Sequence, residues 1–476
     1  MKLKKVLSVI MAATICFSAV GCSSSSGGGS STPVDVADLV VPTFEDAGEM
    51  SLRVDLPPNQ SSREQMEVYK ECGFNLIPMT EDFFSAEAVA DWDGSEETKP
   101  DYIKALEICE DLGIDVWIRP HSNHVQKGAT ADVPVEGPNY FEKFFSNIDF
   151  RDYPAVKGFF FCDEPVYSQL HDLKNRYLPW FNENYGDQEY EFHVNFLGAG
   201  STIWKDSQES FTMVYDDYVG YYINDILSNA EAKNKTFGID TYPLDFDGTS
   251  NVLGENYLRM TLDSKIRAKA KGWMTNAYVQ CFTGYGSLRD PKTYSDISFQ
   301  VYTYLACGVE RMYYYGYRSH GTETHIYDGG EPNEKWYFVQ HANQVLKKFD
   351  GVYFNFEWEG LFANVGTGSR LAEPEHFELI KNMDLDSLRG VKSFKSKYDT
   401  IVGQFKDGDG NDGFMLVNYE EPSKTRTNKT TIEFDNADGV LIYRDGDPEV
   451  IGLANHTFTI DLDPGEGVFI VPLYKK

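Results

Sequence analysis

The chain alternates amphipathic helical segments with short apolar strands, and at four places a glycine stands between a helix and the next strand. Met66, Tyr69 and Cys72 share one face of a predicted helix that ends at Gly73, and a second predicted helix ends in the same way at Gly113, 40 residues later. Two further glycines in the second half of the chain repeat the pattern at a spacing of 36 residues. Repeated helix, glycine and apolar strand predict an α/β fold with a parallel sheet.

Counting the strands indicates which parallel fold this is. Eight apolar strands, each followed by a plausible helix, are predicted at residues 50–56, 74–79, 114–119, 158–162, 190–196, 236–242, 273–281 and 311–317. Eight such units predict a (β/α)8 TIM barrel. A doubly wound sheet usually has fewer strands and a phosphate-binding loop, and the strand-to-helix turns here contain neither a G-x-G-x-x-G motif nor a P-loop.

After about residue 361 the pattern changes to short strands separated by turns. They are predicted at residues 398–405, 413–418, 430–434, 439–443, 458–462 and 467–471, which is typical of a small antiparallel β-sandwich. Asp407, Asp409 and Asn411 have the alternate spacing of a calcium loop, but the helical flanks of an EF-hand are missing, so a hairpin turn is the preferred interpretation. We therefore expect a barrel over residues 45–361 and a β-sandwich domain over residues 362–476.

The N-terminus predicts a lipoprotein signal. A basic start and a short apolar stretch precede Cys22, and a Ser/Gly-rich run follows it. The segment resembles a bacterial lipoprotein signal, which implies a signal peptide at residues 1–21, a lipidated Cys22 and a flexible tether at residues 22–33. Position 19 holds Ala, where Leu is usual. A plain secretory signal is the alternative. The five remaining cysteines are widely spaced in apolar contexts and are predicted to be buried free thiols.

Polar side chains gather where the predicted strands end. TIM barrels place their active sites at the C-terminal ends of the strands. Besides the carboxylates of Asp163 and Glu164 on the fourth strand, the candidate substrate-binding residues are Arg119, His121, His193, Asn195, Asp240, Tyr242, Tyr278, Gln280 and Tyr315. Carboxylates at the end of a buried strand are costly to desolvate, so Asp163 and Glu164 are the candidate catalytic pair.

An apolar fourth strand that ends in Asp163-Glu164-Pro165 resembles the acid/base motif of barrel glycoside hydrolases of clan A, and the C-terminal β domain resembles that of family 42. The resemblance implies that Glu164 is the general acid/base. It also implies a nucleophilic carboxylate on the seventh strand, as in a retaining β-galactosidase, but Gln280 stands there and an amide cannot form a glycosyl ester.

The adjacent Asp-Glu pair is also similar to that of hexosaminidases that use the 2-acetamido group of the substrate as nucleophile. That resemblance implies that Asp163 orients and polarises the acetamide, while a tyrosine such as Tyr242 or Tyr278 holds its oxygen. Two neighbouring carboxylates raise the pKa of one of them, which suits a general acid. The sequence leaves both mechanisms open.

The function expected is that of a cell-surface glycoside hydrolase acting on oligo- or polysaccharides, anchored to the membrane only through lipid. The net charge of −31 argues against nucleic acid or an anionic membrane surface as a partner. No cofactor or metal is expected: His121, His124 and His193 offer ligands, but HxH and HExxH spacings are missing. A non-catalytic glycan-binding lipoprotein is the alternative function, and the oligomeric state stays open.

Overall fold

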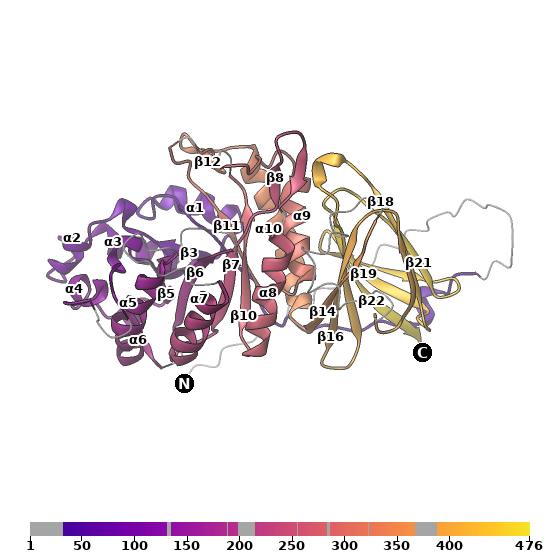
Figure 1. The fold of residues 1–476 in the computed structure, drawn as a ribbon, viewed down its shortest axis with the longest axis horizontal. Coiled ribbons are helices and arrows are strands. Elements are labelled where there is room, and N and C mark those ends of the chain that lie inside the picture. Colours follow the sequence, from indigo (N-terminus) through magenta and orange to yellow (C-terminus); the bar gives the residue numbers. More distant parts are fainter. Residues whose placement is uncertain are drawn as a thin grey trace.

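Eight parallel strands form a nearly closed TIM barrel in the computed structural model (Figure 1). The structure describes residues 32–130, 135–187, 189–198, 215–254, 256–282, 286–321, 323–366 and 388–476. The barrel strands are β2 (Ser51–Val54), β3 (Leu76–Met79), β4 (Asp115–Ile118), β5 (Val156–Asp163), β6 (Glu191–Leu197), β7 (Thr236–Asp240), β10 (Met274–Gln280) and β11 (Arg311–Tyr315). Each overlaps a predicted strand, so the predicted fold is confirmed.

The barrel strands follow one another in chain order around the sheet. The barrel nearly closes where β2, the first strand, lies beside β3, the second. The pairing runs β2–β11–β10–β7–β6–β5–β4–β3, parallel throughout. Between β2 and β3 the backbone amide of Asn75 donates to the carbonyl of Leu52 at 3.1 Å. All eight C-terminal strand ends therefore meet at one mouth of the barrel.

Helices cover the outside of the barrel. They are α1 (Arg63–Glu71), α2 (Ala86–Ala90), α3 (Asp101–Leu112), α4 (Tyr140–Phe144), α5 (Tyr167–Asp172), α6 (Leu178–Tyr185), α7 (Tyr215–Tyr221), α8 (Tyr257–Ala270), α9 (Tyr294–Ala306) and α10 (Glu334–Tyr353). Ser62 caps α1 by accepting from the Gln65 amide, and Gly113 ends α3 with a φ of 63°. None of the helices in the described ranges is both long and apolar enough to cross a membrane.

Two cores hold the barrel together. The larger core lies between the strands and the surrounding helices, and it includes the predicted free thiols, all five of which are buried and unpaired. The smaller core fills the barrel interior with Leu76, Trp117, Phe160, Tyr278 and Tyr313. Side chains that point inward above this second core face the mouth.

The C-terminal domain is an antiparallel β-sandwich, as predicted. One sheet contains β14 (Phe356–Asn364), β16 (Thr400–Asp407), β17 (Asp412–Asn418), β19 (Gly439–Arg444), β20 (Asp447–Gly452) and β22 (Gly467–Lys475), and the other contains β15 (Val391–Ser396), β18 (Asn428–Phe434) and β21 (Thr457–Leu462). The two sheets share an apolar core that includes Leu416 and Phe458. The Asp407 loop is the hairpin turn between β16 and β17, and Asp407 accepts the amides of Asp409 and Asn411.

Two elements of this domain fall outside the predicted range. Strand β14 spans the expected boundary at residue 361 and pairs with β16. Near the N-terminus, β1 (Leu39–Val40) pairs with β22 (Figure 1). The sandwich is thus built from both ends of the described chain.

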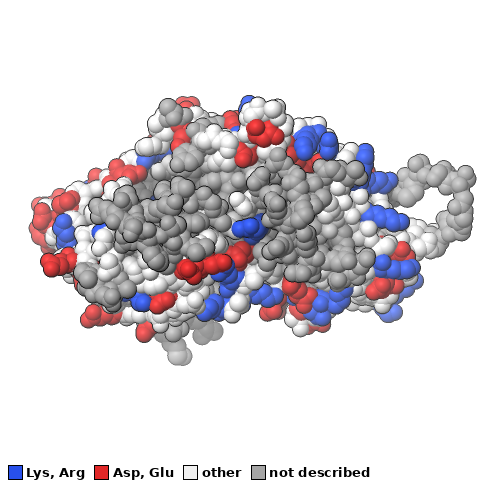
Figure 2. All heavy atoms as spheres, viewed as in Figure 1, with Lys and Arg blue, Asp and Glu red and all other residues white. Residues whose placement is uncertain are grey.

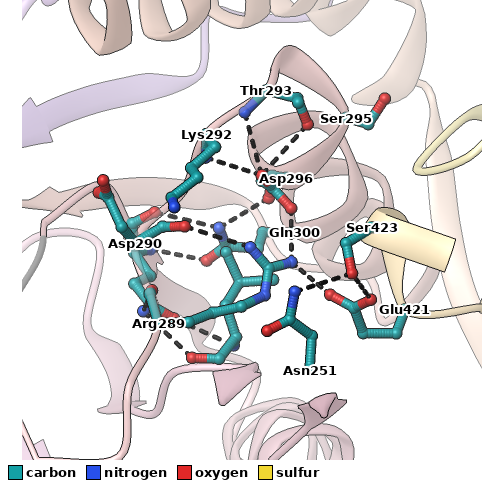
Figure 3. A network of polar contacts seen from close by, with 12 residues as sticks. Asn251, Arg289, Asp290, Lys292, Thr293, Ser295, Asp296, Gln300, Glu421 and Ser423 are labelled. Atoms are coloured by element: carbon teal, nitrogen blue, oxygen red, sulfur yellow. Dashed lines mark hydrogen bonds and ion pairs between the residues drawn. The ribbon is translucent and has the colours of Figure 1, made fainter. Parts of the chain in front are cut away.

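A buried polar network joins the sandwich to the barrel (Figure 3). Arg289, in the loop between β10 and α9, forms ion pairs with Asp296 of α9 and with Glu421 of the sandwich. All three side chains are at least nine-tenths buried. Nearby, the Asn251 amide donates to Ser423 Oγ at 3.0 Å. The sandwich therefore holds two loops that leave the mouth of the barrel.

The negative charge is spread unevenly over the face shown in Figure 2. Acidic side chains gather at the end of the barrel farthest from the sandwich, whereas lysines and arginines are more frequent over the sandwich.

Candidate active site

Strand β5 changes direction twice to bring two consecutive carboxylates to the mouth of the barrel. Its pairing with β6 slips by one residue between Phe160 and Cys162, so Phe161 is extra and Asp163 comes opposite Asn195. This bulge turns Asp163 inward, where an unbroken strand would point it outward. Glu164 then takes a left-handed φ of 49°, uncommon for a residue other than glycine, and reaches Asp240. Such local strain is frequent at functional sites.

Asp163 is held from two sides. Its Oδ2 accepts from Nη2 of Arg119, just after β4, at 2.8 Å, and its Oδ1 accepts from Asn195 Nδ2 of β6 at 2.9 Å. The same Asn195 amide lies 3.3 Å from Asp240 Oδ2 at the end of β7. Two predicted site residues, Arg119 and Asn195, thus hold Asp163, and Asn195 links it to a third, Asp240. The Asp163 side chain stays 26% exposed and within reach of a ligand.

Glu164 forms a hydrogen bond with Asp240, carboxyl to carboxyl. Burial, and then the charge of Asp163, raise the pKa of Glu164 to about 7. Burial raises the pKa of Asp240 well above its ordinary value, and the charges of Glu164 and Asp163 add to this effect. The pair therefore keeps a proton at neutral pH, and Glu164 is the more exposed of the two. A proton held in this way is what a general acid needs.

A row of alternating charges continues below Asp163. Asp55 Oδ1 accepts from Arg119 Nη1 at 3.1 Å and from Arg53 Nη1 at 3.0 Å. Arg53 and Asp55 belong to the first strand and are buried. They were missed because the segment was interpreted only as a strand, although two charges at alternate positions share one face of a strand, and in a barrel that face can be the interior.

Aromatic rings and a small cavity line the rest of the mouth. Tyr242 packs against Phe282 at 5.0 Å between ring centroids, and Phe282 packs against Tyr315 at 5.1 Å. On the side of β2, β3 and β4, a cavity of about 130 Å³ is lined by Leu56, Thr80, Glu81, Asp82, Arg119, Pro120 and His121. Partly exposed tyrosines and carboxylates are the groups from which sugar sites are built.

Three predicted substrate-binding residues lie elsewhere, and the structure contradicts those predictions. His193 and Tyr278 are about 1% exposed in the barrel interior, where His193 Nε2 lies 3.5 Å from Arg53 Nη2 and the Tyr278 hydroxyl accepts from the same guanidinium. They support Arg53 from below. The alternation of side chains along a strand is consistent with an inward position, but it does not give the depth of a side chain in the barrel.

Gln280 is the third. It is completely buried, and its amide bonds to backbone instead of facing the mouth. Its Oε1 accepts from the Leu244 amide at 3.0 Å, and its Nε2 donates to the carbonyls of Arg289 at 2.8 Å and Leu244 at 3.3 Å. Gln280 therefore ties the loops after β7 and β10 together, which explains why an amide, with both a donor and an acceptor, occupies this position.

Two of the three histidines that offer metal ligands, His121 and His124, share one turn after β4, where the His124 amide donates to the His121 carbonyl at 2.9 Å. His124 Nε2 pairs with Glu81 at 2.9 Å, and His121 Nδ1 accepts from the Asn123 amide. His193 lies inside the barrel. Among the residues that the structure describes, no group of three His, Cys, Asp or Glu side chains is placed to hold a metal ion.

No protein-family model and no curated protein matches the chain. Among solved structures, a family 39 glycoside hydrolase from Bacteroides cellulosilyticus is 11% identical over 91% of this chain and 83% of that chain, with a TM-score of 0.47. A family 27 β-L-arabinopyranosidase variant from Geobacillus stearothermophilus is 10% identical over 90% of this chain and 97% of that chain, with a TM-score of 0.48. The TM-scores and sequence identities of these two structures are low, so the function proposed below rests on the site itself.

Proposed function

We propose that this protein is a glycoside hydrolase in which Glu164 is the general acid/base and Asp163 assists. The observation that carries the proposal is the Glu164–Asp240 carboxyl pair, which holds a proton at the mouth of a TIM barrel beside a firmly oriented Asp163. Two carboxyl groups with different protonation at one site are the usual equipment for cleaving a glycosidic bond.

The hydrolysis would begin with protonation. Glu164 gives its proton to the glycosidic oxygen as the bond to the anomeric carbon breaks, and later takes a proton from the attacking water. Until that transfer, Asp240 shares the proton with Glu164 through their hydrogen bond and so holds the acid in place. The aromatic rings of Tyr242 and Tyr315 offer surfaces on which a sugar ring stacks.

Substrate assistance accounts for the nucleophile best. In retaining enzymes the acid and the nucleophilic carboxylate are roughly 5 Å apart, with the anomeric carbon between them. Glu164 and Asp240 are in direct contact, which leaves no such space, and Gln280 at the end of the seventh strand is buried. Asp163 is then the carboxylate left to assist a nucleophile supplied by the substrate. It accepts the N–H of a 2-acetamido group, and the carbonyl oxygen of that group attacks the anomeric carbon to form an oxazoline. Water then opens the oxazoline. The proposed substrates are therefore N-acetylhexosaminides.

A screen of aryl glycosides tests the proposal. Hydrolysis of N-acetylhexosaminides but not galactosides or glucosides, inhibition by a thiazoline analogue, and loss of turnover in Glu164→Gln are expected. Glu433→Gln on the sandwich, where Glu433 is half-buried and pairs with Lys392, is the matched control. A glycosyl–enzyme ester trapped on Asp240 would instead identify a retaining enzyme. Glycan binding without hydrolysis, unchanged in Glu164→Gln, would identify a binding protein and contradict the proposal.

We also propose that lipid on Cys22 anchors the protein at the outer face of a bacterial cell membrane; Cys22 lies outside the described residues. Incorporation of labelled palmitate that is lost in Cys22→Ser is the expected result. Release of soluble, unlabelled protein by the unaltered sequence would instead indicate a plain secretory signal.

A further inference from the structure

Arg53 is a completely buried charge inside the barrel. Its guanidinium carbon lies 4.0 Å from the ring centroid of Tyr313, 4.6 Å from that of Phe160 and 5.1 Å from that of Trp117. Faces of aromatic rings attract a cation, but they replace its hydration only in part. A buried arginine needs a carboxylate partner, and here that partner is Asp55.

Asp55 links Arg53 to the site, because one of its oxygens accepts from two arginines. Oδ1 is 3.0 Å from Arg53 Nη1 and 3.1 Å from Arg119 Nη1. The other end of the Arg119 fork reaches Asp163 Oδ2 at 2.8 Å. A planar fork keeps its two nitrogens in a fixed relation, so the carboxylate at one end sets the direction of the other end.

We propose that Arg53 is a positioning residue for the proposed glycosidase: by satisfying Asp55 it leaves one arm of Arg119 free to hold Asp163. The inference rests on the proposed function for its kinetic consequence, but its structural part does not. Without Arg53, the buried Asp55 keeps Arg119 as its one cationic partner among the residues that the structure describes, and the fork turns toward Asp55 and away from Asp163. A double change that also removes the charge of Asp55 takes away that competition.

The charged and titratable groups around this row come from most strands of the barrel. They are Arg53 on β2 and Asp55 just after it, Arg119 after β4, Asp163 on β5 and Glu164 just after it, His193 on β6, Asp240 on β7, Tyr278 on β10, and Arg311, Tyr313 and Tyr315 on β11. Burial is the main cause of the raised pKa of Glu164. The charges of Asp163 and Asp55 raise this pKa further, whereas the charge of Arg119 lowers it. The titration of Glu164 therefore reports on the row.

The test compares three full-length variants: Arg53→Met, Arg53→Lys and the double variant Arg53→Met/Asp55→Asn. Carboxyl carbons are labelled with ¹³C in Asp and Glu and titrated, and the Glu164 signal is assigned by its absence in Glu164→Gln. In Arg53→Met we expect the Glu164 midpoint to move to higher pH by about one pH unit. We expect a loss in kcat of roughly tenfold or more, as is typical of a displaced orienting group, with little change in KM.

Arg53→Lys should keep part of the kcat that Arg53→Met loses. The double variant should keep more than Arg53→Lys, since Asp55 no longer draws Arg119 away from Asp163. An Arg53→Met protein that folds with the Glu164 midpoint and kcat unchanged would overturn the inference. So would a double variant no better than Arg53→Met. If Arg53→Met does not fold, the same comparisons are made between Arg53→Lys and the double variant. If no glycoside is hydrolysed, the carboxyl titrations alone decide, so failure of the proposed function is told apart from failure of the inference.

Discussion

The carboxyl of Glu164, the residue after β5, is hydrogen-bonded to the carboxyl of Asp240 on β7 across the mouth of the barrel. Neither residue is next to the other in sequence or in the sheet, since β6 lies between their strands. The contact exists because a bulge and a left-handed residue turn the end of β5 inward. It links a local irregularity of the backbone to the proton that the proposed reaction requires.

Activity should fall on the alkaline side with a midpoint near pH 7, because the pKa of Glu164 is raised to about 7 and the acid form is lost above it. The charge of Asp163 is the second cause of this value, after burial. Asp163→Asn should therefore move the alkaline limb to lower pH, besides lowering kcat. The measurement is kcat/KM from pH 4 to 9. A limb that moves to higher pH in Asp163→Asn would contradict the assignment.

Glu164 should also cost stability at neutral pH. Its folded-state pKa lies above the ordinary value, so the folded state binds the proton more tightly, and stability falls as pH rises from about 4.5 to 7. Because the side chain is partly exposed, we expect Glu164→Gln to raise the free energy of unfolding by about 1–2 kcal/mol at pH 8, with little change at pH 4. Urea unfolding at both pH values measures this. Equal effects at both would contradict the raised pKa.

Gln280→Glu should destabilise the protein without creating a nucleophile. A carboxylate cannot donate to the carbonyls of Leu244 and Arg289, and the site is completely buried. A loss of about 2–4 kcal/mol in the free energy of unfolding is expected from burying a charge that has no cation beside it and from taking the side-chain donor away from the Arg289 carbonyl. The Leu244 carbonyl keeps the Arg289 amide as its donor at 3.0 Å. A variant of normal stability with increased turnover of galactosides would instead support a seventh-strand nucleophile.

The buried ion pair between barrel and sandwich should matter more than an exposed one. Glu421→Gln leaves Arg289 with Asp296 only, and we expect a loss of about 2–4 kcal/mol. Lys348→Gln removes an exposed pair with Asp447 between α10 and β20 and should cost less than about 1 kcal/mol. Urea denaturation of both variants tests this, and losses of similar size would show that burial does not distinguish the two pairs.

The repeated pattern of helix, glycine and apolar strand predicted all eight barrel strands, because strands buried on both faces leave a strong apolar signal. The position of Asp163, Glu164 and Asp240 at one mouth of the barrel followed from that prediction, since the C-terminal ends of parallel strands share one edge. The bulge at Phe161 was not predictable: a single extra residue leaves no mark in an apolar run. Neither was the buried role of Gln280, because its partners are backbone groups of two different loops, and a backbone group carries no signal in the sequence.

The dependence of activity on the leaving group tests the central claim, that Glu164 is the general acid, most directly. The dinitrophenolate of a 2,4-dinitrophenyl glycoside leaves without being protonated, whereas a poor leaving group needs a proton from the general acid. Glu164→Gln should lose a factor of roughly 10² to 10⁴ in kcat/KM on the poor leaving group and far less on the dinitrophenyl glycoside. Equal losses on both substrates, or no loss on either, would contradict the assignment.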